Sequence, residues 1–273
     1  MIYIFMSMKF EIISIGNELL SGRTLNSNLQ TICQKLTDIG CNVSRSYVIQ
    51  DDPTEISNVL NLCISSDSDW IIISGGLGPT FDDMTLSCIS STLNLPLEIN
   101  DIALEMIITR YADLVKKNII ESFSLTDSRK KMAMLPKNSI PLKNYVGTAP
   151  GVLIKYKNKN IVCLPGVPKE MESILINEVL PTIDTSKINK IKSKVLFITG
   201  ITESELSPII NDFLLNRNNL YIKSHPKGIS NGVYHIELVI SFQSNDFSDS
   251  LINLIIKDLI ISIKIKTNIT VDE

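Results

Sequence analysis

Short apolar runs alternate with amphipathic stretches through the first part of the chain. The pattern predicts strands over 10–15, 42–48 and 70–73, with helices over 29–39 and 52–63 between them. The third strand is apolar at every position, as expected inside a parallel sheet that is covered on both faces. Strands and helices in strict alternation predict right-handed βαβ units. The fold class that follows is α/β, a three-layer αβα domain with a mostly parallel sheet.

The same periodicity continues toward the middle of the chain. It predicts helices near 84–93, 101–117 and 126–133, two strands around a polar turn over 151–164, and a helix over 167–179. A proline at 181 closes that last helix. We therefore expect a first domain over residues 9–181.

A second, smaller domain is predicted after a polar, lysine-rich linker at 182–194. The pattern beyond it reads strand, helix, strand, strand, helix, over 195–198, 202–215, 220–223, 233–240 and 251–263. That order is typical of a two-layer α+β domain, which we assign to residues 194–273.

Composition and charge narrow the functional classes. Hydrophobic residues make up 44% and charged residues 20% of the 273 residues, with a net charge of −3 and a pI near 5.6. The chain has no basic footprint, so we expect no nucleic-acid partner. No apolar run is long enough for a membrane span, and the apolar start lacks the basic region of a signal peptide. We interpret Met6 and Met8 as alternative translation starts. We expect a cytoplasmic protein.

The cysteines and histidines offer little material for chemistry. The five cysteines include no CxxC pair, and we expect all five to be reduced and structural. The two histidines, His225 and His235, are too few for a His-rich zinc site or a Ser-His-Asp arrangement. His225 and Lys223 lie in a polar loop that could contact a ligand or partner. The sequence contains neither a P-loop motif nor a GxGxxG motif between a strand and a helix.

The strongest chemical signal is the segment SGGLGPTFDD at 74–83, directly after the buried third strand. Glycines let a ligand approach main-chain N–H groups closely, and α/β sheets bind ligands at the carboxyl ends of their strands. A following helix N-terminus favours an anion such as phosphate. The structural alternative is a tight turn whose glycines satisfy only backbone geometry. The candidate ligand contacts in this segment are Ser74, Gly75, Gly76, Gly78, Thr80 and Asp82.

Carboxylates follow two of the predicted strands. Asp83 ends the glycine segment, and Asp51 follows the second strand; Asp52 beside it is suited to cap a helix. Carboxylates bind Mg²⁺ together with waters and substrate phosphates. Our hypothesis from these residues is a Mg²⁺ ion held between Asp51, Asp83 and a pyrophosphate of the ligand.

Three further Gly- or Pro-containing loops supply weaker signals, because each alone is also a common turn. The first follows the first strand and leads toward a polar Asn-Ser-Asn stretch at 26–28. The other two are GTAPG at 147–151 and a Pro-Gly segment at 165–166 that runs into a helix. Their candidate ligand-binding residues are Asn17, Glu18, Gly22, Asn28, Gly147, Thr148, Gly151, Pro165 and Gly166.

Four ordered motifs together resemble one known family. They are IGNELLSG (15–22), SGGLGPTFDDMT (74–85), GTAPG (147–151) and LPGVPKEM (164–171). They are similar to the molybdopterin-binding (MoaB/Mog-like) domain, and more closely to the N-terminal region of CinA-type proteins and their stand-alone archaeal relatives. The resemblance covers about residues 9–180 and extends weakly into GITESEL and IKSHPKG of the second domain.

The resemblance implies a site at the strand ends that binds a nucleotide or pterin. Carried over by position, its residues are Gly75, Gly76, Gly78, Thr80, Asp83 and Thr85, with Asp51. CinA-type domains imply a pyrophosphatase that acts on ADP-ribose or a related dinucleotide. Its cofactor would be a divalent metal, Mg²⁺ or Co²⁺, and Asp51 and Asp83 would be its metal ligands and catalytic residues. The molybdenum-cofactor branch implies molybdopterin binding or adenylylation.

The sequence also departs from the family pattern. Asn26 stands where the family has an acid, which puts full metal chemistry in question, and GGLG replaces the GGTG of the pterin branch. The family's C-terminal deamidase domain has no counterpart in these residues, so we do not expect deamidation. Three hypotheses stay open: a metal-dependent hydrolase, a molybdopterin-binding protein, and a non-catalytic nucleotide-binding module. The resemblance further implies a homo-oligomer, a dimer or trimer.

Overall fold

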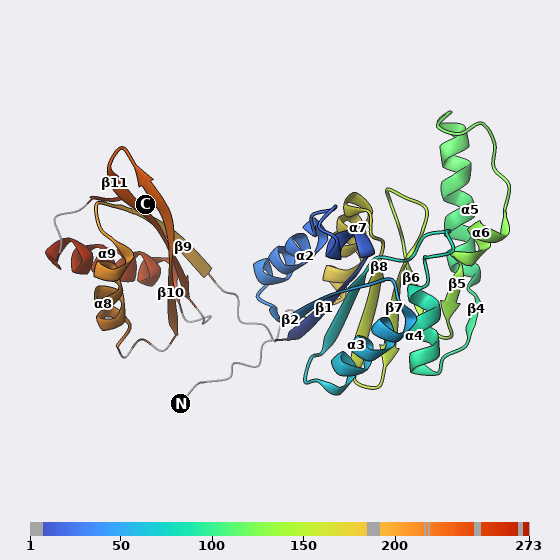
Figure 1. Ribbon diagram of the computed structural model, residues 1–273, viewed down its shortest axis with the longest axis horizontal. Helices are drawn as coiled ribbons and strands as arrows, with labels where there is room; N and C mark the ends of the chain where they lie inside the picture. The colour runs from blue at the N-terminus through green and yellow to red at the C-terminus, as the bar shows by residue number, and fades with distance from the viewer. Residues whose placement is uncertain are drawn as a thin grey trace. The chain divides into compact units, whose positions relative to one another are not determined.

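The structure is a computed structural model that describes residues 8–184, 192–215, 217, 219–242, 247–266 and 270–272. The chain divides into two compact units, Met1–Ile188 and Asn189–Glu273 (Figure 1). The predicted linker at 182–194 falls mostly on residues outside the described ranges, as does Met6. Within those ranges, no helix is long and apolar enough to cross a membrane.

A six-stranded sheet forms the centre of the first unit. Its strand order is β2-β1-β3-β8-β7-β6; neighbours from β2 to β8 run parallel, and β7 and β6 are joined antiparallel. A small antiparallel pair, β4 with β5, lies apart from it. The strands are β1 (Lys9–Ile15), β2 (Asn42–Ile49), β3 (Trp70–Ser74), β4 (Leu97–Ile99), β5 (Met134–Pro136), β6 (Ile140–Leu142), β7 (Gly151–Tyr156) and β8 (Lys159–Leu164).

Helices cover both faces of this sheet (Figure 1). One core contains Ile13, Ile73 and Leu60, and the other contains Ile12, Ile72 and Ile32. Consecutive strand residues therefore point into different cores, which is why the third strand is apolar throughout. The helical segments are α1 (Asn17–Leu20), α2 (Ser27–Asp38), α3 (Pro53–Ser65), α4 (Thr85–Leu93), α5 (Asp101–Lys116), α6 (Asp127–Lys131), α7 (Pro168–Ile174), the π-helix η1 (Leu175–Val179) and the 3₁₀-helix η2 (Leu180–Thr182).

The second unit has the order β-α-β-β-α-β. Its antiparallel sheet has the strand order β10-β11-β9-β12, and its core includes residues of both helices. The elements are β9 (Lys192–Thr199), α8 (Glu203–Leu214), β10 (Leu220–Ser230), β11 (Val233–Phe242), α9 (Asp249–Lys266) and β12 (Thr270–Asp272).

The predicted fold class is confirmed: a mostly parallel α/β sheet with a further small domain. The sequence pattern missed the short strands β4, β5, β6 and β12, and it ended β10 too early. Strands of three residues carry too few positions for a period of two to be detected. β10 continues because its outer half is exposed and pairs with β11, a pairing that apolar periodicity does not signal.

Candidate functional site

Four parallel strands end on the same edge of the first sheet, and four loops meet there. β1 leads into Gly16, β2 into Asp51, β3 into Gly75 and β8 into Pro165. Main-chain bonds join these loops: the N–H of Gly16 donates to the carbonyl of Ile49, and that of Gly75 to the carbonyl of Leu164. The motifs picked out in the sequence at 15–22, 74–85 and 164–171 are therefore neighbours in space.

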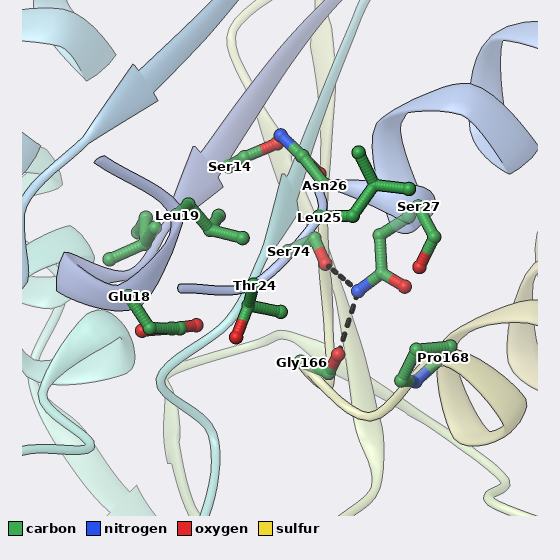
Figure 2. A pocket seen from close by; sticks show the side chains of 12 residues that line it. Ser14, Glu18, Leu19, Thr24, Leu25, Asn26, Ser27, Ser74, Gly166 and Pro168 are labelled. Atoms are coloured by element: carbon green, nitrogen blue, oxygen red, sulfur yellow. Dashed lines mark hydrogen bonds between the residues drawn. The ribbon is translucent and has the colours of Figure 1, made fainter. Parts of the chain in front are cut away.

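A small pocket of about 80 Å³ opens between the loops after β1 and β8 and the end of β3 (Figure 2). Of the predicted ligand-binding residues, it brings together Glu18, Asn28, Ser74 and Gly166. In Figure 2, Ser14 and Asn26 lie in the upper middle of the view with Ser74 below them, Leu19 lies to the left and Pro168 to the lower right. The residues that line it are Ser14, Ile15, Glu18, Leu19, Thr24, Leu25, Asn26, Ser27, Asn28, Ser74, Gly166 and Pro168.

The side chain of Asn28 ties three of the loops together. Its Nδ2 donates to the hydroxyl of Ser74 at 3.0 Å and to the carbonyl of Gly166 at 2.7 Å, the two dashed lines of Figure 2. The Ser74 hydroxyl in turn donates to the carbonyl of Pro165 at 3.4 Å. The start of α2 is thus fixed against the ends of β3 and β8.

Three buried polar atoms on the pocket-lining residues have no hydrogen-bond partner among the described residues. They are the Ser14 hydroxyl, Oδ1 of Asn28 and Nδ2 of Asn26. The other oxygen of the Asn26 amide is occupied, because it caps α2 by accepting from the N–H of Leu29 at 3.1 Å. Buried polar groups are nearly always hydrogen-bonded, so three unpartnered atoms on residues that line one pocket are an unusual concentration.

The glycine segment is packed against the protein itself. A Cβ on Gly75 would overlap the Ile15 carbonyl, and one on Gly76 would overlap the hydroxyl of Thr85. The Thr85 hydroxyl donates to the carbonyl of Gly75 at 2.9 Å and fixes α4 to the loop. Gly75 also has a φ of +117°, a conformation that side chains rarely adopt. Close packing of the chain therefore accounts for these two glycines.

The turn that follows the glycines is stabilised by its own acidic side chains. Oδ2 of Asp83 accepts from the N–H of Thr80 at 2.8 Å and from its hydroxyl at 2.6 Å. The same hydroxyl contacts Asp82 and, as the largest cause, lowers the pKa of that carboxyl. Lys131 donates to the Thr80 carbonyl, and it lines a second small pocket with Gly76, Gly78 and Asp83.

Asp51 and Asp52 have different partners. Oδ2 of Asp51 accepts from the N–H of Asn17 at 2.9 Å and holds the first loop against the end of β2. Asp52 caps α3 by accepting from the N–H groups of Thr54 and Glu55, as its sequence position predicts. Asp51 and Asp83 each keep a second oxygen with no hydrogen bond or ion pair to the described residues.

Among the described residues, we looked to the acidic, histidine and cysteine side chains for a metal site. The described residues contain no cluster of three or more His, Cys, Asp or Glu that could hold a metal ion. Mg²⁺ commonly takes only one or two carboxylates and completes its shell with waters and substrate phosphates. Neither Asp51 nor Asp83 lines the pocket of Figure 2, and Asp83 alone of the two lines the second small pocket beside Lys131.

The loop at 147–151 is held by contacts of its own. Oδ1 of Asn144 accepts from the N–H of Gly147 at 2.7 Å, and Nδ2 of Asn144 donates to Glu170 at 2.6 Å. A Cβ on Gly147 would overlap the Glu170 carboxylate, while one on Gly151 would press on Ile174. Gly147, Thr148 and Gly151 are not among the residues that line the pocket of Figure 2.

Sequence reasoning missed part of the pocket wall. Ser14, Thr24, Leu25, Asn26, Ser27 and Pro168 line the pocket but were not predicted as ligand contacts. Ser14 does carry a signal, since it is the last hydroxyl in an otherwise apolar strand end and is 1% exposed. Leu25 carries none, because an exposed leucine is common on protein surfaces.

The remaining candidate residues lie elsewhere. Lys223 and His225 are exposed on β10 of the second unit.

All five cysteines are free thiols, and four are buried. Burial raises the pKa of the Cys41 thiol to about 12 and keeps it protonated at neutral pH.

The family match lies within the first unit, and the similar proteins extend beyond it. Residues 11–185 match the family described as "Probable molybdopterin binding domain". A protein of Sulfurisphaera tokodaii is 41% identical over 218 residues, 80% of this chain and 80% of that protein. A protein of Pyrobaculum arsenaticum is 36% identical over 252 residues, 91% of this chain and 92% of that protein.

Among solved structures, the chain is similar to the protein CinA from Thermoplasma acidophilum, which is described as having unknown function. The two are 40% identical, with a TM-score of 0.56, over 62% of this chain and 95% of that one. All residues that line the pocket of Figure 2 fall within the matched segment 11–185.

Proposed function

This chain belongs to the probable molybdopterin-binding domain family, and from that premise we propose that it binds a nucleotide or pterin ligand at the carboxyl edge of its first sheet. We further propose that it hydrolyses the pyrophosphate bond of ADP-ribose or a related dinucleotide with the help of Mg²⁺ or Co²⁺. The resemblance of its four motifs to CinA-type domains supports this choice of reaction.

The observation that carries the binding proposal is the pocket between the loops after β1 and β8 and the end of β3. It lies at the carboxyl ends of parallel strands, where open α/β sheets bind their ligands. Three of the residues that line it, Ser14, Asn26 and Asn28, each have one buried polar atom without a partner among the described residues. A protein that buries unpaired polar atoms gains free energy when a ligand pairs with them.

Asp51 and Asp83 are the residues that would hold the cation, each through its uncommitted carboxylate oxygen. A divalent cation supplies positive charge that stabilises developing negative charge on pyrophosphate oxygens. In the reaction, a water oxygen forms a bond to one phosphorus, and the bond from that phosphorus to the bridging oxygen breaks. The products are AMP and ribose 5-phosphate, and two protons are released to solvent as the phosphates ionise.

The test is AMP release from ADP-ribose by the purified full chain with Mg²⁺, Co²⁺ or EDTA. We compare wild type with Asp83→Asn, which keeps an acceptor for the Thr80 N–H but removes a carboxylate. The matched control is Asp38→Asn on the exposed end of α2. We expect metal-dependent release from wild type and Asp38→Asn, and at least a tenfold loss in Asp83→Asn. AMP release that persists in EDTA would contradict the metal-dependent hydrolase proposal. The absence of AMP release with every metal would contradict it as well.

Molybdopterin binding is the second candidate, favoured by the family match itself. It predicts tight binding of a pterin without release of AMP from ADP-ribose. A third reading, binding without catalysis, is favoured by the hydrogen bonds that Asp51 and Asp83 already make within their loops. Titration with AMP and with a pterin distinguishes molybdopterin binding from nucleotide binding without catalysis.

The assembly and location of the protein also remain predictions. We propose a homo-oligomer, a dimer or trimer, in the cytoplasm. Light scattering after size-exclusion chromatography gives the mass of the assembly, and a monomer at assay concentration would contradict the proposed oligomer.

A further inference from the structure

The helix α9 of the second unit has two separate apolar stripes. The first is buried in the core of that unit and consists of Ile252, Ile256, Leu259 and Ile263. The second is exposed, with exposed fractions from 39% to 79%, and consists of Leu251, Leu254, Ile261 and Ile265. A surface helix ordinarily has one apolar stripe, which faces the core. The core accounts for the first stripe and leaves the second unexplained.

The exposed stripe has the spacing of a contact between helices. With Asp258 included, its positions are 251, 254, 258, 261 and 265, in successive steps of three, four, three and four residues. This is the heptad pattern in which a and d side chains pack into holes on a second helix. The stripe therefore fits another helix better than an extended segment, whose side chains alternate with a period of two.

A groove of about 470 Å³ lies between α8 and α9. The two helices contact each other on one face of the sheet of the second unit (Figure 1). The residues that line the groove are Ile209, Asp212, Phe213, Arg217, Asp258, Ile261, Ser262 and Ile265. Apolar side chains of both helices thus form its walls, and the C-terminal half of the exposed stripe belongs to it.

Two opposite charges in this groove have no ion pair with the described residues. The Arg217 guanidinium donates to the carbonyl of Phe213 at 2.5 Å and lies 4.1 Å from the centre of that ring. The Asp258 carboxylate has neither a hydrogen bond nor an ion pair with the described residues. Both side chains line the groove without pairing with each other.

These charges indicate what covers the groove. A lipid surface would bury the Asp258 carboxylate in the middle of the stripe without a counter-ion, which is unfavourable. A second copy of the chain brings its own Arg217 to Asp258 and its own Asp258 to Arg217, because a two-fold axis makes every contact twice. A pair of copies therefore covers both exposed stripes and pairs all four charges.

We propose that the groove between α8 and α9 is a contact surface between two copies of this chain. In that contact α9 of each copy packs into the groove of the other, and Arg217 of each pairs with Asp258 of the other. The inference specifies one surface of the proposed homo-oligomer and rests on that proposal to this extent. It is independent of the proposed ligand and reaction.

The variant Ile261→Glu tests the apolar part of the surface. It places an unpaired carboxylate in the contact between copies, while in a single copy this position is 53% exposed and tolerates a charge. Leu254→Glu, at a position that is 56% exposed, is a second variant of the same kind. Asn253→Glu adds the same charge to the exposed side of α9 outside the stripe and serves as the matched control.

The measurement is sedimentation of the full chain over a dilution series, with circular dichroism as the check on folding. We expect an even number of copies in wild type. Ile261→Glu and Leu254→Glu should halve the mass of the assembly and weaken pairing by about a hundredfold or more. Asn253→Glu should match wild type.

The contrary outcomes separate this inference from the proposed homo-oligomer. An unchanged mass in both stripe variants would overturn the inference and leave the homo-oligomer intact. A trimeric wild type would do the same, because pairs of copies cannot build an odd number. A monomeric wild type would overturn both, and none of these results bears on AMP release from ADP-ribose.

The pairing of charges has a test of its own. Asp258→Arg and Arg217→Asp should each weaken pairing by about tenfold or more, because charges of one sign then meet across the contact. An equal mixture of the two variants should pair again, since each chain then carries one sign and its partner the other. A mixture that pairs no better than either variant alone would overturn the proposed contact.

Discussion

The two units of the chain use their sheets in different ways. Every residue of β3 in the first unit is buried, whereas β11 in the second alternates buried positions with more exposed ones. The first sheet has a core on each face, and the second has a single core that includes residues of both its helices. A doubly covered sheet leaves little room for polar side chains on its faces, so most of them gather where its strands end. Glu11 of β1 is an exception, and it is buried in an ion pair with Arg45 of β2.

Glycines illustrate the same difference. Gly75 and Gly228 both have positive φ values, +117° and +90°. A Cβ at Gly75 would overlap the main chain of β1, but one at Gly228 would meet nothing within 4 Å. The loop of the first unit is thus a packed structure, while the hairpin of the second has space around it. The following predictions test that comparison.

The largest effect is expected from Gly75→Ala. Backbone strain and overlap with Ile15 should together destabilise the first unit by about 3–5 kcal/mol. Gly228→Ala, with strain alone, should cost about 1 kcal/mol in the second unit. Urea denaturation followed by fluorescence of Trp70, the single tryptophan of the chain, reports on the first unit, and far-UV circular dichroism reports on both. Equal costs for the two variants would contradict the packed loop.

Leu238→Ala should cost about 2–5 kcal/mol by opening a cavity in the core of the second unit. Leu238 is fully buried among residues of that unit only. In urea denaturation followed by circular dichroism, part of the signal should be lost at a lower urea concentration than in wild type. The midpoint reported by Trp70 should stay within error of wild type, and a parallel shift would show that the two cores unfold together.

A smaller effect is expected from Asp52→Ala in the first unit. The substitution removes the acceptor for two N–H groups at the start of α3 and should cost about 1 kcal/mol. The Trp70 midpoint measures it. Asp52→Asn, which can still cap the helix, should recover most of the loss.

The smallest effect concerns pH and the capping box of α8. The hydroxyl and N–H of Thr202 lower the pKa of Glu205 below its ordinary value of 4.5. A lowered folded-state pKa stabilises the fold above that ordinary value, and the stabilisation is lost as the pH falls through the lowered pKa. The difference in melting temperature between wild type and Glu205→Gln should therefore shrink as the pH falls below about 4.5. A difference that stays constant from pH 7 to pH 3 would contradict this account.

The long elements could be predicted from the sequence because their periods are long enough to detect. α2, α3 and α5 repeat their apolar positions over at least three turns, and β3 is uniformly apolar. The caps at Asp52 and Thr202 follow from local residue order and are confirmed by their hydrogen bonds. The three-residue strands of both units carry no such repeat, and only pairing with distant partners makes them strands.

The candidate site also combines features that local sequence determines with features that depend on distant partners. The sequence by itself determined that polar, glycine-containing loops follow strands of a parallel sheet, and therefore that they meet at one edge, because the period and order of elements are local properties. Only the tertiary structure decided that Asn28 joins Ser74 to Gly166 and that Ser14, Asn26 and Asn28 line one pocket. It also decided that Gly75 and Gly76 pack against their own chain. Those facts depend on side chains far apart in the sequence, and their hydrogen bonds exist only once the sheet has brought the loops together.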